Sequence, residues 1–445
     1  MNSQIMQAFR GPSPVTDLRG KKILFANFPA DGHFNPLTGL ALHLRSIGCE
    51  LCWYTSEKYA SRIGKMNIRH YPFKQAVDSA ILEKVFPERD AIKGQVAKLN
   101  FDIIHAFILR GPEYFKDILD IYEEFPFEVM VADCAFTGIP FVTDKMNIPV
   151  ISIGVLPLME TSIDLPPAGI GMTPSYTFAG KIKQAVLRYV ANKIIFRKPN
   201  RVMRLLFSKY GIDHLNANVF DLLVKKASLL LQSGTPGFEY RRSDLGKNVR
   251  FVGPLLPVQL VKATGQWFDE RLGRYQQIVL VTQGTVEKNI EKILAPMLEA
   301  FKGTSTLVIA TTGGTGTAEL RRRFPHDNLI IEDFIPFADI MPYADVYISN
   351  GGYGGVMLGI GNRLPMIVAG VHEGKNEINA RIGYFKLGIN LKTEWPTSSQ
   401  LKQAVEVIMN DDLYKDNVTR LAKEFSEYKP NELCAGYLAQ LVLGV

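Results

Sequence analysis

The stretch LFANFPADGHFNPLTGLALHL, residues 24–44, decides the fold, because a strand pattern passes directly into a helical one. The apolar run KILFANF at 22–28 is typical of a buried strand, and leucine and alanine then recur at helical spacing up to residue 44. A strand, a short connection and a helix form the first half of a βα unit. His33 lies in the connection, at the carboxyl end of the predicted strand.

The same alternation of apolar runs and helical patterns continues along the chain in two series. Further strands are predicted at 51–55, 127–133 and 149–154 in the first series, and at 277–283, 305–312, 328–333, 345–349 and 366–370 in the second. Strands that alternate with helices form parallel sheets. We therefore predict an α/β protein with two Rossmann-like domains that face each other across a cleft, where ligands of such sheets bind.

A length of 445 residues is too great for one hydrophobic core, which agrees with two domains. The proline- and glycine-containing stretch FVGPLLPVQLVKATGQ at 251–266 marks the boundary between them. We expect a flexible N-terminal tail at 1–20, an N-terminal domain at 21–254, a linker at 255–266, a C-terminal domain at 267–428 and a helix at 429–445. This last helix is a candidate to pack back on the N-terminal domain.

The composition excludes several classes of protein. The formal net charge is +7, yet the densest basic cluster is only Arg321–Arg323, which favours a solvated face or a small anionic ligand over nucleic acid. No apolar stretch reaches the length of a membrane-spanning helix, and residues 1–20 lack the apolar core of a signal peptide, so we expect a cytoplasmic protein. Cys49 and Cys52 form a C-x-x-C at a strand rather than at a helix start, which is typical of ordinary strand cysteines.

His33 and Asp133 are the candidate pair for acid–base chemistry. A helix N-terminus disfavours the imidazolium form, so a histidine there is available as a neutral base. Asp133 ends another predicted strand of the same half, and a carboxylate commonly orients a histidine base. The residues alone also allow a His33 that bonds the loop backbone and an Asp133 that caps a helix.

Three glycine-rich turns follow strands in the second half, at 282–285, 311–317 and 349–358. Backbone amides in such turns bind phosphates, although tight turns alone also explain them. None matches the P-loop pattern, and GGYGG lacks the dinucleotide spacing, so a P-loop hydrolase and a nicotinamide enzyme are disfavoured. No D-x-D occurs to hold a divalent ion on a diphosphate, so we expect no metal and no other cofactor.

The stretch FPADGHFNPLTGLALHL at 28–44 resembles the N-terminal signature of the inverting family 1 glycosyltransferases, a G-H-x-x-P element after the first strand. The resemblance extends through 131–154, FVGPLL, VTQGT and 334–381. It implies a GT-B fold with an acceptor-binding N-terminal half and a nucleotide-sugar-binding C-terminal half. It also implies that His33 deprotonates the acceptor hydroxyl, that Asp133 holds the tautomer of His33, and that the sugar is transferred with inversion.

The resemblance further implies a donor site. Phe334 stacks the nucleobase, the backbone of Ile335 reads its edge, and Asn350 stands at the position of the family's diphosphate-binding histidine. The donor-binding residues implied in this way are Gly32, Gly284, Thr285, Phe334, Ile335, Asn350, Gly352, Tyr353, Gly354, Gly355, Glu373, Lys375 and Asn376.

Three departures from the family pattern concern the donor. The ribose-binding glutamate and glutamine fall on Leu358 and Phe337, which favours a deoxyribose nucleotide. The loop GVHEGKNEINAR at 370–381 carries an insertion, so the sugar-reading pair falls on Gly374 and Lys375 or on Lys375 and Asn376, with Glu373 as the nearest acid. This combination is most similar to bacterial flavonoid glycosyltransferases of the rhamnosyltransferase subgroup, which use dTDP-L-rhamnose.

The expected partners are therefore a nucleotide sugar and a small aromatic acceptor, with neither nucleic acid nor membrane, and the oligomeric state is not indicated. Residues 101–115 and 157–178 are candidates to line the acceptor pocket. Three alternatives stay open, namely a UDP-glucose-dependent glucosyltransferase of small aglycones, a transferase for lipid-linked acceptors that uses the basic segment 181–207, and a non-catalytic nucleotide-sugar-binding protein.

Overall fold

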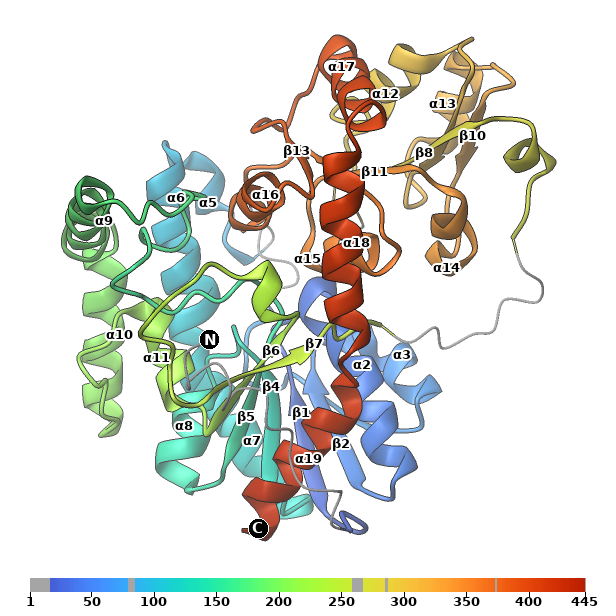
Figure 1. The fold of residues 1–445 in the computed structure, drawn as a ribbon. Coiled ribbons are helices and arrows are strands. Elements are labelled where there is room, and N and C mark those ends of the chain that lie inside the picture. The colour runs from blue at the N-terminus through green and yellow to red at the C-terminus, as the bar shows by residue number, and fades with distance from the viewer. Residues whose placement is uncertain (1–16, 79–84, 258–266, 285–286, 373, 445) are drawn as a thin grey trace.

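The computed structural model describes residues 17–78, 85–257, 267–284, 287–372 and 374–444. The first domain is built on a seven-stranded parallel sheet with the order β3-β2-β1-β4-β5-β6-β7 (Figure 1). Its strands are β1 (Lys22–Ala26), β2 (Glu50–Thr55), β3 (Arg69–Pro72), β4 (Val129–Asp133), β5 (Val150–Gly154), β6 (Leu229–Ser233) and β7 (Val249–Gly253).

Helices cover both faces of this sheet, because its strands are apolar on both sides. They are α2 (Asp31–Ser46), η1 (Glu57–Tyr59), α3 (Ala60–Lys65), α5 (Glu88–Ala91), α6 (Gln95–Asp102), η3 (Ile103–Phe107), η4 (Ile108–Arg110), α7 (Gly111–Glu124), α8 (Ile139–Phe141), η5 (Val142–Met146), α9 (Phe178–Val190), η6 (Ala191–Ile195), α10 (Arg197–Tyr210), α11 (Val219–Lys226) and η7 (Pro236–Phe238).

The second domain repeats the architecture with a six-stranded parallel sheet of order β10-β9-β8-β11-β12-β13. Its strands are β8 (Gln277–Thr282), β9 (Thr306–Thr311), β10 (Leu329–Glu332), β11 (Val346–Ser349), β12 (Met366–Val368) and β13 (Gly388–Asn390). Its helices are η8 (Glu270–Gly273), α12 (Leu294–Phe301), α13 (Thr317–Arg323), α14 (Phe337–Ile340), η9 (Met341–Tyr343), α15 (Tyr353–Gly361), α16 (Lys375–Tyr384) and α17 (Ser398–Met409). Two parallel-sheet Rossmann-like domains confirm the predicted fold class.

The C-terminal helices α18 (Asp412–Ser426) and α19 (Pro430–Leu443) run from the second domain back along the first (Figure 1). Val418 and Leu421 of α18 belong to a core of the second domain, whereas Cys434 and Leu438 of α19 belong to a core of the first. The two domains are therefore joined at the chain end as well as at the crossing near residue 257.

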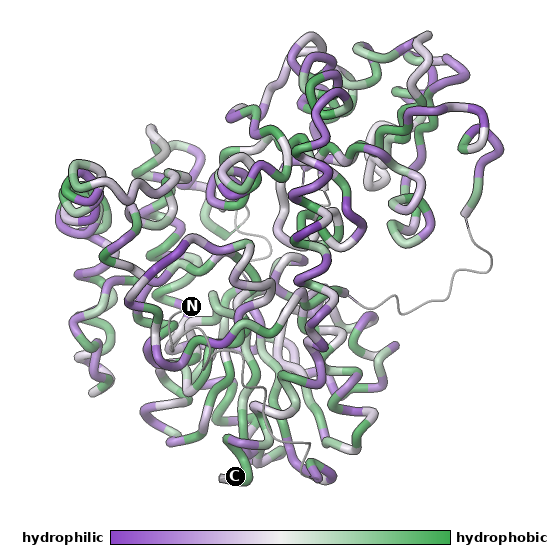
Figure 2. The backbone as a smooth tube through the Cα atoms, in the orientation of Figure 1, coloured by the Kyte–Doolittle hydropathy of each residue, from purple (hydrophilic) through white to green (hydrophobic). Residues whose placement is uncertain are grey.

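The predicted strands are all present, most of them shortened by a residue or two at their ends. Four strands were not predicted, which are β3, β6, β7 and β13. β3 and β13 are edge strands of four and three residues, too short to give a period-two pattern. Figure 2 shows the strands of the first domain as largely hydrophobic segments under more hydrophilic outer helices. Within the described ranges, no helix has the length and apolarity needed to cross a membrane.

Candidate active site

His33 and Asp133 meet at one edge of the first sheet. β1 and β4 are neighbours, with Ala26 paired to Ala132, so both strands end at the same place. Asp133 is the last residue of β4. His33, which the sequence pattern places in the connection, lies instead in the first turn of α2, because that helix begins at Asp31. The His33 Nδ1 and Asp133 Oδ1 atoms are 2.6 Å apart. The topology thus brings together two residues that are 100 positions apart in the sequence.

The surroundings of Asp133 determine which nitrogen of His33 carries the proton. The Asp133 side chain is fully buried, and its Oδ2 accepts a hydrogen bond from the Phe28 backbone N–H at 2.6 Å. Oδ1 accepts a second one from the Ala135 N–H at 2.8 Å. Because the carboxylate serves only as an acceptor, Nδ1 of His33 donates to it, and Nε2 is left as the acceptor nitrogen. The His33 side chain keeps 14% exposure.

Cys134, the residue after Asp133, does not compete as a nucleophile. Burial, and then the charge of Asp133, raise the pKa of its thiol to about 12. A thiol with such a pKa stays protonated near neutral pH. Cys49 and Cys52 are free and buried, as expected for strand cysteines.

A pair of stacked aromatic side chains lies beside His33, and one of them contacts its ring. The ring of Phe28 lies edge-on to the imidazole with centroids 5.4 Å apart, and it stacks on Phe107 at 4.5 Å. Both phenylalanines are partly exposed. Phe107 ends the π-helical turn η3, and the Thr137 hydroxyl donates to its carbonyl at 2.8 Å. Phe107 belongs to the stretch 101–115 expected to line an acceptor pocket, whereas Phe28 was not singled out, although its place after the strand was a usable signal.

In the second domain, Phe334 follows β10 and is 70% exposed. An aromatic ring this exposed is free to stack on a ligand. It lies beside the glycine-rich turn after β9, since a Cβ added to Gly314 would come within 3.5 Å of its ring. Ile335 is 5% exposed and packs into the domain core, so its backbone is the part available to a ligand.

The turn at 350–355 connects β11 to α15. The Asn350 Nδ2 donates to the Gln283 carbonyl at 2.5 Å, which joins this turn to the end of β8. A Cβ added to Gly284 would lie 3.1 Å from that Asn350 nitrogen. Gly352 caps α15, and the first N–H groups of a helix, here including Gly354 and Gly355, have no acceptor within it. Such unpaired donors are suited to bind an anion, which stays a prediction for this turn.

Gly32 and Gly354 both face open space. Gly32 is exposed in the first turn of α2, and a Cβ added to either glycine would meet nothing within 4 Å. Each domain thus exposes a glycine whose backbone no neighbouring side chain covers. A ligand can approach such backbone closely.

Tyr353 has a different role from the one its position in the donor signature suggests. The Tyr353 side chain is 7% exposed, and its hydroxyl donates to the Ser233 carbonyl of the first domain at 2.6 Å. Gln232 Nε2 donates to the same hydroxyl at 3.3 Å. The side chain therefore joins the two domains, and only the backbone of Tyr353 is left for a donor.

The loop predicted to read the sugar also contacts the first domain. Asn376 Nδ2 donates to the Gly169 carbonyl at 2.9 Å. Glu377 Oε1 accepts from the N–H groups of Gly169 at 2.9 Å and Gly171 at 2.8 Å. Lys375 is the first residue of α16. Asn376 is thus engaged by the stretch 157–178, and Thr285 and Glu373 lie outside the described residues.

A buried ionic cluster lies behind this loop. Arg381 of α16 bonds Glu239 of the first domain at 2.8 Å and Glu377 at 3.2 Å, and it lies over the Tyr240 ring at 4.2 Å. Burial lowers the pKa of Arg381, but Glu239 and Glu377 outweigh it and raise that pKa above its ordinary value. No local sequence pattern predicts this contact, because its partners are 142 residues apart.

The two positions that lack the family's ribose-reading groups are apolar in their surroundings. Leu358 and Phe337 are partly buried and pack against the core of the second domain. The Phe337 and Tyr347 ring centroids are 6.2 Å apart. Among the residues with described positions, no group of three or more histidine, cysteine, aspartate or glutamate side chains is arranged to hold a metal ion.

Comparison with known proteins agrees with the fold. Residues 304–440 match the family model of the erythromycin biosynthesis protein CIII-like C-terminal domain. The chain is 30% identical over 410 residues to 4'-demethylrebeccamycin synthase of Lentzea aerocolonigenes, which covers 92% of this chain and 96% of that protein. It is 26% identical to UDP-glycosyltransferase 2 of Phaeomoniella chlamydospora, over 91% of this chain and 92% of that one.

Solved structures show the same fold. The glycotransferase of kitacinnamycin superimposes with a TM-score of 0.74 at 17% identity, covering 95% of this chain and all of that one. The calicheamicin glycosyltransferase CalG4 gives a TM-score of 0.71 at 18% identity, covering 96% of this chain and 99% of that one. Fold and site thus define a GT-B enzyme that transfers sugars. The chain belongs to the family 1 glycosyltransferases.

Proposed function

We propose that this glycosyltransferase moves L-rhamnose from dTDP-rhamnose to a hydroxyl of a flavonoid or similar phenol, with inversion and without a metal ion. The observation that carries the chemistry is the 2.6 Å contact between His33 Nδ1 and Asp133 Oδ1. It leaves Nε2 of His33 free to take the acceptor proton. A phenol with a pKa of about 10 is within reach of a histidine base.

The remaining steps follow from the placement of the residues. The deprotonated oxygen attacks C1 of the sugar as the nucleoside diphosphate leaves from the opposite side, and Asp133 stabilises the imidazolium that forms. The N–H groups at the start of α15 are preorganised donors for the departing diphosphate. The stacked Phe28 and Phe107 offer an apolar surface beside the base, which favours an aromatic acceptor.

The donor assignment rests on the second domain. The exposed ring of Phe334 is suited to stack a nucleobase, and the apolar Leu358 and Phe337 suit a sugar without a 2′-hydroxyl. UDP-glucose is the competing donor, because relatives of this chain include UDP-glucosyltransferase 1 of Beauveria bassiana, 26% identical over 437 residues.

The deciding experiment is a donor screen. The purified protein is incubated with quercetin and dTDP-rhamnose, UDP-rhamnose, dTDP-glucose or UDP-glucose, with and without EDTA, and products are identified by mass spectrometry. We expect a deoxyhexose adduct mainly with dTDP-rhamnose and no effect of EDTA. A hexose adduct from UDP-glucose would refute the donor assignment, and loss of activity in EDTA would refute the metal-free mechanism.

The base is tested separately with His33→Ala. We expect kcat to fall by about 10²- to 10⁴-fold, the usual contribution of a general base. His43→Ala on the same helix is the matched control and should keep full activity. Unchanged turnover of His33→Ala would overturn the mechanism, whereas an unmodified protein inactive with every donor would favour a binding role.

A further inference from the structure

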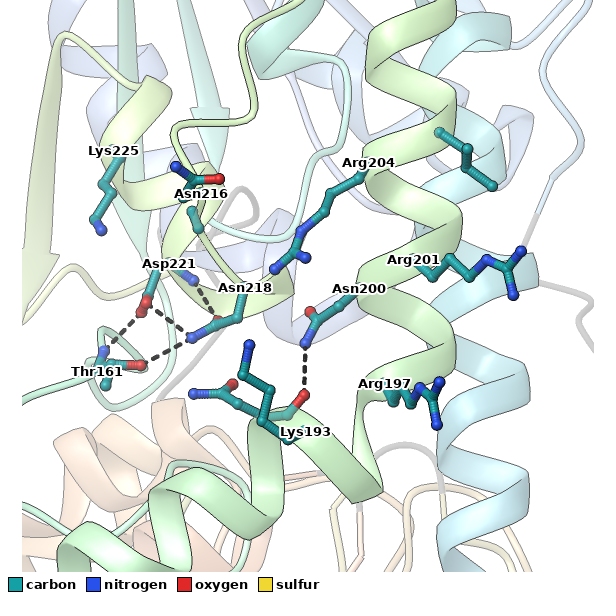
Figure 3. A pocket seen from close by; sticks show the side chains of 13 residues that line it. Thr161, Lys193, Arg197, Asn200, Arg201, Arg204, Asn216, Asn218, Asp221 and Lys225 are labelled. Carbon is teal, nitrogen blue, oxygen red and sulfur yellow. Dashed lines mark hydrogen bonds between the residues drawn. The ribbon is translucent and has the colours of Figure 1, made fainter.

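A cavity of about 500 Å³ lies in the first domain, between η6, α10 and α11 and beside Thr161 (Figure 3). It shares no residue with the His33–Asp133 pair or with the donor-binding loops. Its walls are formed by Thr161, Asn192, Lys193, Arg197, Asn200, Arg201, Arg204, Leu205, Asn216, Ala217, Asn218, Asp221 and Lys225.

The cavity carries an excess of positive charge that the protein does not neutralise. Five cations line it, against the single acid Asp221. The Asp221 carboxylate is already engaged, because it accepts from the Thr161 N–H at 2.7 Å and from Asn218 Nδ2 at 2.8 Å. In the described parts of the chain none of the five cations forms an ion pair, whereas Arg321 and Arg323 on the other domain are both paired with glutamates.

Arg204 is the least exposed of the five cations that line the cavity. Its Nε is buried and has no hydrogen-bond partner. Figure 3 shows the Arg204 guanidinium and the Lys193 ammonium reaching toward the same space beside Asn218, from α10 and from η6. A guanidinium fork next to an ammonium matches the charge and geometry of a phosphate.

We propose that this cavity binds a phosphate group, as a site separate from the glycosyl-transfer centre. Lys193 and Arg204 hold the phosphate oxygens, and Asn216 and Lys225 lie at the opposite wall. Arg197 and Arg201, also on α10, line the cavity and raise its positive potential. The phosphate belongs to a small soluble ester or to a lipid headgroup.

The helix next to the cavity supports a lipid source for the phosphate. α9 exposes an apolar stripe of Phe178, Ile182, Val186 and Tyr189, with exposures of 83%, 51%, 56% and 64%. Leu205 at the cavity wall is 62% exposed. Apolar side chains next to a basic site match the chemistry of an anionic phospholipid.

The soluble source is tested with pyrophosphate, titrated at constant ionic strength while the melting temperature is recorded. We expect a saturable rise in the wild type and an apparent affinity at least 10-fold weaker in Arg204→Met and in Lys193→Ala. Lys209→Ala is the matched control, because Lys209 is exposed on α10 outside the cavity. Pyrophosphate bound only at the donor loops would leave the response unchanged in both cavity variants and would overturn the proposal.

The lipid source is tested by sedimentation with phosphatidylglycerol vesicles and with phosphatidylcholine vesicles. Binding to the anionic vesicles that is lost in Lys193→Ala and kept in Lys209→Ala supports the site and identifies a headgroup as its ligand. A pyrophosphate response without vesicle binding supports a soluble ester instead. The site is refuted if neither response occurs, or if the responses persist in Lys193→Ala. The Lys193 side chain is exposed, so this variant is expected to fold. Neither assay depends on transferase activity, so the phosphate site and the proposed glycosyl transfer can each be refuted without the other.

Discussion

At the scale of single residues, Asp133 holds the catalytic geometry through three donors. Its oxygens accept from the His33 ring and from the N–H groups of Phe28 and Ala135. The carboxylate thus positions both the base and the loop that carries it. One buried side chain thus holds the His33 ring and two backbone segments together.

We therefore predict that Asp133→Asn impairs both activity and stability. An asparagine presents an NH₂ group where only acceptors fit, so it loses the Nδ1 tautomer of His33 and leaves a backbone N–H unpaired. We expect kcat to fall on the order of 10²-fold or more and the free energy of unfolding to fall by about 1–3 kcal/mol. Steady-state kinetics and chemical denaturation measure the two effects. A variant as active as the wild type would exclude Asp133 as the orienting group.

Phe334 gives a cleaner separation of binding from folding, because its side chain is 70% exposed. We predict that Phe334→Ala leaves the melting temperature unchanged and raises the donor KM by about 5- to 100-fold, since stacking of a base on an aromatic ring contributes about 1–3 kcal/mol. Phe268, which is 61% exposed, provides the control substitution Phe268→Ala. Equal KM values in both variants would contradict the stacking role.

At the scale of elements, the turn between β11 and α15 depends on one glycine for its shape. Gly351 has φ of +84°, and a Cβ there would lie 1.7 Å from Asn379 Oδ1. Asn379 in turn donates to the Gly370 carbonyl at 2.9 Å, at the start of the loop predicted to read the sugar. Gly351 therefore lets the turn before α15 and the loop before α16 approach each other.

We predict opposite effects for two glycines of this turn. Gly351→Ala should lower the free energy of unfolding by about 2 kcal/mol or more, because it adds left-handed strain to a steric clash. Gly354→Ala should be neutral or up to about 1 kcal/mol stabilising, since its Cβ meets nothing and alanine favours helix. Thermal denaturation distinguishes them. If the diphosphate lies at this helix start, Gly354→Ala should nevertheless raise the donor KM.

At the scale of the whole molecule, the two domains are joined by buried polar contacts that converge on α16. Arg381 pairs with Glu239 across the domain boundary, and Glu377 accepts from Gly169 and Gly171. These contacts join the loop expected to read the sugar to a loop of the first domain.

We predict that Arg381→Met lowers the free energy of unfolding by about 3–5 kcal/mol, because it leaves Glu239 and Glu377 buried without their cation. Adding Glu239→Gln to that variant should recover part of the loss, and a double-mutant cycle measures the coupling. Arg322→Met, at an exposed arginine of α13, serves as the control and should change the stability by less than about 0.5 kcal/mol. Additive losses would show that the pair does not couple the domains.

The sequence by itself determined the fold class, because strand and helix periodicities are local properties of the chain. The β1 and β4 runs place His33 and Asp133 at strand ends, and parallel neighbours end at one edge, so their meeting was predictable. The sequence also predicts the glycine-rich turns after the strands. The short edge strands were not, since three or four residues carry too little pattern.

The tertiary structure alone decided what depends on distant partners. Tyr353 lies within a donor motif, yet its hydroxyl bonds Ser233, 120 residues away. Arg381 and Arg204 look alike in sequence, but the first meets two buried carboxylates and the second lines an open cavity without an acceptor for its Nε. A side chain's partner is determined by which elements the folded chain packs beside it, and no local pattern encodes that.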